Sequence, residues 1–105
     1  MTKASLRVLY PHPTDAEKFD QDYQQHLALF HEKTKIPKDK PPYTVSKFHA
    51  TPLGNAAYYQ MFSLPFDSME ALQQTMMSAE MQSVAADAVK ISTGGQPVVL
   101  IASDQ

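Results

Sequence analysis

Apolar and aromatic residues gather in four short segments of the chain, a pattern that predicts β-strands. These segments are residues 6–10, 43–50, 57–64 and 97–103, and prolines or other turn-forming residues adjoin each of them. Residues 51–55 (Thr-Pro-Leu-Gly-Asn) have turn chemistry and separate the second and third segments. They predict an antiparallel hairpin.

Between the first and second segments, apolar residues recur every three or four positions, which predicts an amphipathic helix. Residues 14–17 resemble a capping box, with Thr14 as the N-cap and Glu17 reaching back, and the helix is expected to end near residues 32–35. The apolar face of this helix comprises Phe19, Tyr23, His26, Leu27 and Phe30.

A second helix follows the third strand segment. Asp67 is the expected N-cap, and Met69, Leu72 and Met76 share the apolar face. Ser78 caps a short continuation, which the glycine pair at residues 94–95 ends. The sequence therefore predicts the order βαββαβ.

This order predicts an α+β, ferredoxin-like βαββαβ fold with a four-stranded antiparallel sheet and both helices on one face of it. We expect one domain over residues 1–105. Neighbouring strand positions such as Met61 and Phe62, or Leu100 and Ile101, would place apolar side chains on both faces of the sheet. The helices cover one face, so we expect a second copy to cover the other in a homodimer, two sheets forming a barrel.

Composition narrows the function classes. The net charge of −2 offers no basic surface for nucleic acid, and no apolar run approaches the length of a membrane span. The absence of cysteine excludes disulfides, a thiol nucleophile and thiolate metal sites. The four lysines and three prolines of residues 33–42 suit an exposed loop. We expect a cytoplasmic protein that binds neither nucleic acid nor membrane.

Several motifs resemble those of the EthD-like family. The segment Phe19-x-x-x-Tyr23-x-x-His26 is similar to that family's phenylalanine–aromatic–histidine signature. Four further segments follow the second half of the family in order, so the resemblance covers nearly the whole chain: residues 66–72, 78–80, 86–87 and 92–95. The lysine-rich loop and the lack of tryptophan depart from the commonest family pattern.

The resemblance implies a dimeric α/β barrel. The family is named for a protein encoded beside a cytochrome monooxygenase system that degrades ethyl tert-butyl ether, and the association with oxidoreductases rests on that neighbourhood. Similar barrels include cofactor-free monooxygenases, isomerases, cyclases, dehydratases and haem-degrading enzymes, so the fold alone selects no reaction.

Three residues are candidates for catalysis. His26 lies on the apolar face of the first helix, and a histidine is the natural proton carrier near neutral pH. Tyr23 lies three residues earlier and can reach the same pocket, and Tyr59 lies on a predicted strand. Each of them could instead be an ordinary core or strand residue.

Ligand-binding candidates surround this predicted pocket. They are Tyr10, His49, Phe19, Phe30 and Met76, and the methionine would give a plastic wall for an apolar compound. His26 and His31 are five residues apart, on different sides of a helix, and cannot clamp one metal ion. The chain lacks a phosphate loop and a dinucleotide fingerprint, so we expect neither a metal nor a cofactor.

Two functions of different classes remain open. One is a small catabolic or tailoring enzyme that acts on an apolar carbonyl or enol compound by enolisation, dehydration or cyclisation, with His26 as general acid/base. The other is a non-catalytic accessory or ligand-binding dimer that serves a neighbouring oxidase. Haem binding is a third reading, although no histidine is placed by a motif as an axial ligand.

Overall fold

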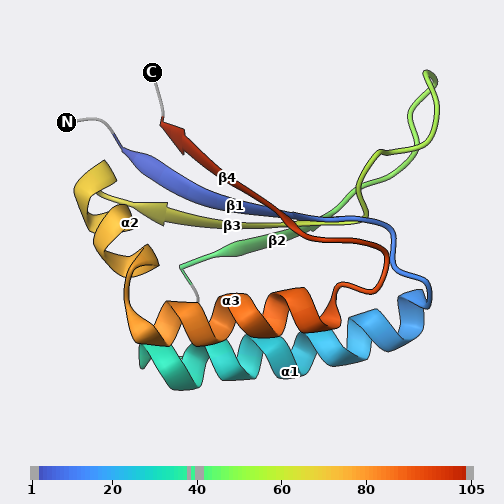
Figure 1. The fold of residues 1–105 in the computed structure, drawn as a ribbon. Helices are drawn as coiled ribbons and strands as arrows, with labels where there is room; N and C mark the ends of the chain where they lie inside the picture. Colours follow the sequence, from blue (N-terminus) through green and yellow to red (C-terminus); the bar gives the residue numbers. More distant parts are fainter. Residues whose placement is uncertain (1–2, 38, 40–41, 104–105) are drawn as a thin grey trace.

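A computed structural model describes residues 3–37, 39 and 42–103, which form a sheet with helices on one side (Figure 1). The elements are β1 (Ala4–Tyr10), α1 (Ala16–Thr34), β2 (Thr44–Lys47), β3 (Gln60–Phe66), α2 (Met69–Met76), α3 (Ala79–Ile91) and β4 (Val98–Ser103). The strands are ordered β2-β3-β1-β4, and all neighbours are antiparallel. This confirms the predicted ferredoxin-like fold.

The helices form a second layer. α1 and α3 lie side by side beneath the sheet, and α2 lies at one end of it (Figure 1). Alternate residues of β1 and β3 face this layer because successive strand side chains point to opposite faces. The core between the layers includes Leu6, Tyr10, Phe19, Phe30, Phe62, Leu64, Leu72 and Val84.

The strand bounds differ from the sequence prediction in the hairpin. β2 is shorter than the predicted segment 43–50, and β3 begins at Gln60 instead of residue 57. Residues between these strands form an arm that projects beyond the sheet (Figure 1). Thr51 and Gly54 exchange two backbone hydrogen bonds, of 2.8 and 3.0 Å, at the predicted turn. The exposed arm has no layer to pack on. The apolar pattern of the sequence therefore overestimated the length of β2 and placed the start of β3 too early.

Both helix N-caps lie one residue later than predicted. Asp15, not Thr14, caps α1 and accepts a 3.1 Å hydrogen bond from the amide of Lys18. Ser68, not Asp67, caps α2 and accepts from the amide of Ala71. In each pair two adjacent residues have cap chemistry, so the sequence could not decide between them.

The helix predicted between Ser78 and the glycine pair at residues 94–95 is confirmed in place, but it is a separate helix and not a short continuation of α2. Ser78 does cap a helix, accepting from the amide of Met81. That helix is α3, with 13 residues, and it packs along α1, whereas α2 has 8. Its buried face is made by Met81, Val84, Ala88 and Ile91.

The segment after α1 is anchored by His31. Lys35 ends the helix in the left-handed conformation, with φ of 64°. The buried His31 imidazole bonds the Ile36 carbonyl oxygen through Nδ1 and the Tyr43 hydroxyl through Nε2, each at 2.8 Å. Residues 38, 40 and 41 of the predicted loop lie outside the described residues.

None of the described helices covers the other face of the sheet (Figure 1). The strand registers place four apolar side chains together on this face: Leu9, Met61, Val98 and Leu100. Arg7 shares the face and is paired in register with Ser63 and Leu100, so the surface is mixed rather than uniformly apolar. Among the described residues, no helix has the length and apolar character needed to cross a membrane.

Candidate functional site

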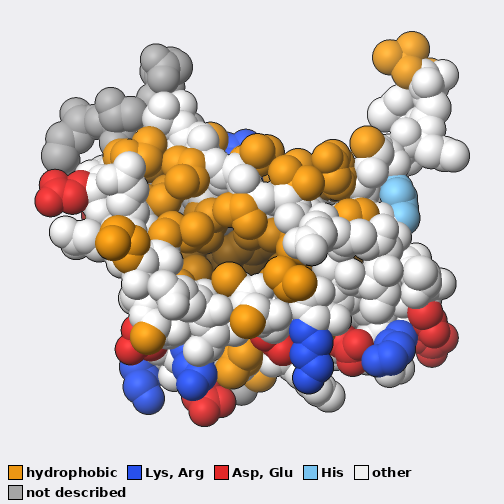
Figure 2. All heavy atoms as spheres, in the orientation of Figure 1, with side chains coloured by type: hydrophobic (Ala, Val, Ile, Leu, Met, Phe, Trp, Pro, Cys, Tyr) orange, Lys and Arg blue, Asp and Glu red, His pale blue; other side chains and the backbone are white. Residues whose placement is uncertain are grey.

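An apolar cavity of about 260 Å³ lies between the sheet and α3. Figure 2 shows it as a hollow surrounded by hydrophobic side chains. The sheet contributes Leu6, Val8 and Phe62, and α3 contributes Val84 and Ala88. α3 leaves the edge strand β4 partly uncovered, since the helix-facing Val99 and Ile101 are 51% and 48% exposed. The cavity opens beside this edge.

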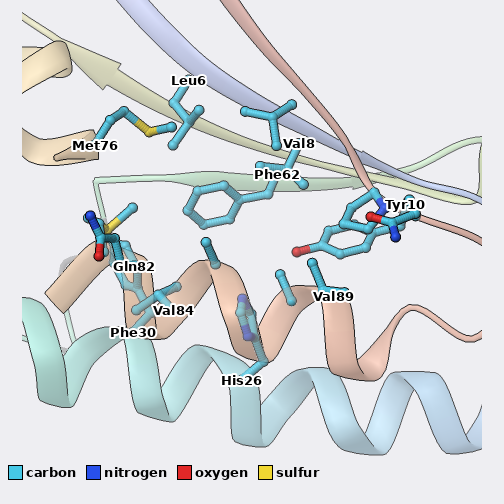
Figure 3. Close-up of a pocket in the computed structure, with 16 residues that line it drawn as sticks. Leu6, Val8, Tyr10, His26, Phe30, Phe62, Met76, Gln82, Val84 and Val89 are labelled. Carbon is cyan, nitrogen blue, oxygen red and sulfur yellow. The ribbon is translucent and has the colours of Figure 1, made fainter. Parts of the chain in front are cut away.

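Four of the residues singled out from the sequence line this cavity: Tyr10, His26, Phe30 and Met76. They come from β1, α1 and α2, and Figure 3 shows their side chains around one space. His26 and Phe30 reach it together because residues four apart on a helix share a face. The role of these residues in binding or catalysis stays a prediction.

The imidazole of His26 is held by a carboxylate. His26 is 4% exposed, and its Nδ1 lies 2.8 Å from Oδ2 of Asp87 on α3. A carboxylate can only accept a hydrogen bond, so Nδ1 carries the proton and Nε2 is left as the basic nitrogen. This is the arrangement that positions a histidine as a general base.

Burial governs the charge of His26. It lowers the pKa of the imidazole below its usual 6.5, while the hydrogen bond and the negative charge of Asp87 act in the opposite direction and offset part of the shift. The imidazole is therefore neutral at pH 7. A neutral imidazole beside a carboxylate can take up a proton, and the carboxylate stabilises the imidazolium that results.

Tyr23 and Phe19 lie behind the cavity instead of lining it. The Tyr23 ring lies 5.4 Å from the His26 ring and 5.5 Å from the Tyr10 ring, and it stacks on Phe19 at 5.7 Å. Both side chains are almost fully buried in this aromatic cluster. The expectation that Tyr23 shares the cavity surface with His26 is therefore wrong, although the two rings are in contact.

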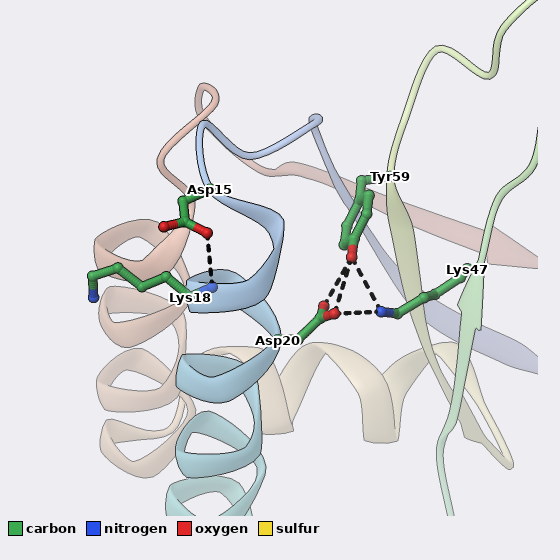
Figure 4. A network of polar contacts seen from close by, with 5 residues as sticks. All are labelled: Asp15, Lys18, Asp20, Lys47 and Tyr59. Atoms are coloured by element: carbon green, nitrogen blue, oxygen red, sulfur yellow. Dashed lines mark hydrogen bonds and ion pairs between the residues drawn. The ribbon is translucent and has the colours of Figure 1, made fainter.

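Tyr59 is engaged elsewhere. Its hydroxyl donates to Oδ1 of Asp20 at 2.9 Å, and Lys47 Nζ donates to Oδ2 of Asp20 at 2.8 Å (Figure 4). The hydrogen bond from Lys47 is the main cause that holds the pKa of Asp20 below its usual range. This network clamps α1 to the hairpin. The prediction that Tyr59 lies in the pocket was therefore wrong, because Asp20 and Lys47 hold its hydroxyl outside the cavity.

His49 also lies outside the cavity. β2 ends at Lys47, so His49 falls in the exposed arm instead of on a strand. The prediction that it faces the pocket was therefore wrong. Among the described residues, no group of three or more His, Asp or Glu side chains is placed to hold a metal ion.

Sequence reasoning missed two polar residues near the cavity. Asp87 was noted only as part of a family motif, and Gln60 was not singled out within the predicted strand 57–64. The partnership of Asp87 with His26 spans 61 positions in the chain. It depends on how α3 lies along α1, and helix periodicity alone does not fix that register.

Comparisons with known proteins give matches by structure. No protein-family model matches the sequence, and no curated protein matches it significantly. The chain resembles an ethyl tert-butyl ether degradation (EthD) family protein from Bacillus halodurans, with a TM-score of 0.79 and 27% identity. The match covers 98% of this chain and 99% of that one.

Two other solved structures share the fold at lower identity. A dimeric ferredoxin-like protein of unknown function from Jannaschia sp. has a TM-score of 0.67 at 13% identity, covering 97% of this chain and 98% of that one. A hydroxynitrile lyase from Passiflora edulis has a TM-score of 0.71 at 10% identity, and the match covers 98% of this chain and 94% of that one. The chain thus has the α+β fold of dimeric ferredoxin-like proteins, in the form found in the EthD family.

Proposed function

We propose that residues 1–105 form one EthD-like domain that works as a homodimer, binds a small apolar organic compound in the cavity and moves a proton on it through His26. The observation that carries this proposal is the His26–Asp87 pair at the wall of an otherwise apolar cavity. A proton-transfer residue needs both a fixed tautomer and a substrate space beside it, and this pair has both.

The chemistry follows from the geometry. Nε2 of the neutral His26 accepts a proton from a carbon next to a carbonyl group, and the electrons of that C–H bond move into the enolate. The Asp87 carboxylate, bound to Nδ1, stabilises the imidazolium formed in this step. Return of the proton to a different atom completes an isomerisation, and loss of a leaving group completes a dehydration. None of these steps calls for a cofactor.

The homodimer is supported by two observations. The uncovered sheet face carries the apolar group Leu9, Met61, Val98 and Leu100, and structural neighbours of the chain are dimeric. Packing two such faces together would bury this apolar surface. The dimer also agrees with the two-sided apolar pattern of the strands.

The proposal is tested with a ketone probe, 1-indanone, in D2O. We expect the wild-type protein to catalyse deuterium uptake at the carbon next to the carbonyl, measured by mass spectrometry. His26→Gln should lower this rate on the order of a hundredfold to ten-thousandfold, the usual loss when a general base is removed. His49→Gln replaces an exposed histidine outside the cavity and should keep the full rate.

A second function is favoured by one observation. The imidazole of His26 is 4% exposed and the surrounding wall is almost entirely hydrocarbon, which also suits a protein that only binds and carries an apolar compound. In that accessory role, 1-indanone would bind without deuterium uptake in either the wild-type protein or His26→Gln. That result would overturn the acid/base proposal and support the accessory function.

A further inference from the structure

Two polar side chains are buried without hydrogen-bond partners close to the cavity. They are the Tyr23 hydroxyl and Nε2 of Gln60, neither of which has a partner among the described residues. Tyr23 is 3% exposed and Gln60 is 2% exposed. A buried polar group without a partner loses its hydrogen bonds to water and gains none in return, so its presence calls for an explanation.

Both side chains adjoin Tyr10. Gln60 is directly opposite Tyr10 in the β1–β3 register, so the two side chains lie on the same face of the sheet. The Tyr23 ring packs edge-on against the Tyr10 ring at 5.5 Å. Tyr10 lines the cavity, and Figure 3 shows its side chain pointing from the sheet into that space. Tyr10 thus stands between the two unpartnered groups and any bound compound.

The protonation of the tyrosines fits a donor role. Burial is the main cause that raises the pKa of Tyr10 and of Tyr23 above the usual range, so both hydroxyls keep their protons at neutral pH. Tyr10 further raises the pKa of Tyr23, and Gln60 lowers it. The Tyr23 ring also lies 5.4 Å from the ring of His26, which is bound to Asp87, so this cluster lies beside the His26–Asp87 pair.

We propose that the compound bound in this cavity carries a hydrogen-bond-accepting oxygen, as in a ketone or its enolate, and that Tyr10 donates a hydrogen bond to it. Tyr23 and Gln60 act behind Tyr10 as positioning residues, and donate to its oxygen when the ligand is bound. A chain of donors that ends on one ligand oxygen strengthens the last hydrogen bond. The apolar walls hold the rest of the ligand.

This inference rests on the proposed function and deepens it, since it assigns the residue that holds the carbonyl oxygen of the substrate. An oxygen held by Tyr10 would lie in the cavity that His26 also lines. Tyr10 would stabilise the negative charge that develops on the oxygen while His26 removes the neighbouring proton. Replacement of Tyr10 would leave His26 in place as the base. The role of Tyr10 as a hydrogen-bond donor can therefore be tested separately from the role of His26.

The test compares 1-indanone with indane, which has the same bicyclic frame and no oxygen. Binding of each is measured by calorimetric titration. We expect Tyr10→Phe to lower the affinity for 1-indanone about five- to tenfold, because one neutral hydrogen bond is lost. The affinity for indane should stay unchanged. Tyr58→Phe removes a tyrosine hydroxyl outside the cavity lining and should change neither affinity.

The infrared carbonyl stretch of bound 1-indanone gives a readout that a structural role would not move. We expect it at lower frequency in the wild-type protein than in Tyr10→Phe, with Tyr23→Phe and Gln60→Leu between the two. An unchanged stretch in Tyr10→Phe, or an equal loss of both ligands, would overturn the inference while leaving His26 as the base. Failure of both ligands to bind the wild-type protein would overturn the proposed cavity function and this inference with it.

Discussion

His26 and Asp87 are joined at 2.8 Å across the interface of α1 and α3, although they lie 61 positions apart in the chain. This contact fixes which nitrogen of the imidazole is basic, and it lies at the wall of the cavity. Burial lowers the pKa of His26, and the hydrogen bond and the negative charge of Asp87 each raise it by less. The charge of the pair therefore depends on the balance between these opposing causes.

The substitution Asp87→Asn tests this balance. The amide oxygen of the new side chain can still accept a hydrogen bond from Nδ1, but the negative charge is lost, so we expect the pKa of His26 to fall further below its usual value. The measurement is an NMR titration of the imidazole carbon-bound protons. An unchanged or higher pKa of His26 would show that Asp87 does not act on it.

The same shift makes stability depend on pH. Because burial lowers the pKa of His26 in the folded protein, the unfolded chain binds that proton more tightly. The contribution of His26 is therefore fully present above about pH 6.5, the unfolded pKa, and it is lost as the pH falls through the lower folded value. Urea unfolding of the wild-type protein and His26→Gln at pH 7.5, 6.5 and 5.5 measures this. As the pH falls, the free energy of unfolding of the wild-type protein should decrease relative to that of His26→Gln. A difference between the two proteins that stays constant with pH would contradict this explanation.

The order of the elements could be predicted from the sequence, because turn residues bound the apolar runs of the strands and 3–4 spacing marks the helices. The hairpin was less predictable: residues 48–59 keep an apolar pattern, with Phe48, Leu53, Tyr58 and Tyr59 among them, yet form an arm rather than strands. Leu53 is 99% exposed there. Pattern alone does not reveal whether a segment has a layer to pack against.

The candidate site was predictable only as far as it follows one helix or strand face. His26 and Phe30 share a face of α1 with a fixed spacing, and both line the cavity. Asp87 and Gln60 depend on the register of α3 on α1 and of β3 beside β1, which local sequence does not encode. Tyr59 was misplaced for a similar reason, since Asp20 on α1 and Lys47 on β2 bind its hydroxyl.

The polar clamp of Asp20, Lys47 and Tyr59 should be structural. We expect Tyr59→Phe to keep 1-indanone binding and deuterium uptake, and to lower the free energy of unfolding by about 0.5–1 kcal/mol, because the clamp is partly exposed to solvent. Chemical denaturation measures the loss of stability, and the deuterium-exchange assay measures whether the catalysed uptake is kept. Loss of exchange with intact folding would return Tyr59 to the catalytic site.

The uncovered sheet face should be the dimer interface. Light scattering at micromolar concentration should give about twice the chain mass of 11.7 kDa. Met61→Lys places a charge among the apolar residues of this face, so it should prevent association and lower stability. Gln21→Lys adds the same charge at an exposed position of α1 and should leave the mass unchanged. A stable wild-type monomer would refute the barrel arrangement.

The pH profile of deuterium uptake by 1-indanone tests the central claim most directly. Nε2 of His26 must be neutral to accept a proton, so the catalysed rate should be level near pH 7 and above, and fall at acidic pH around a pKa below 6.5. His26→Gln should show no catalysed component at any pH. A rate that rises as the pH falls below 6.5, or a full rate in His26→Gln, would contradict the assignment of His26 as the base.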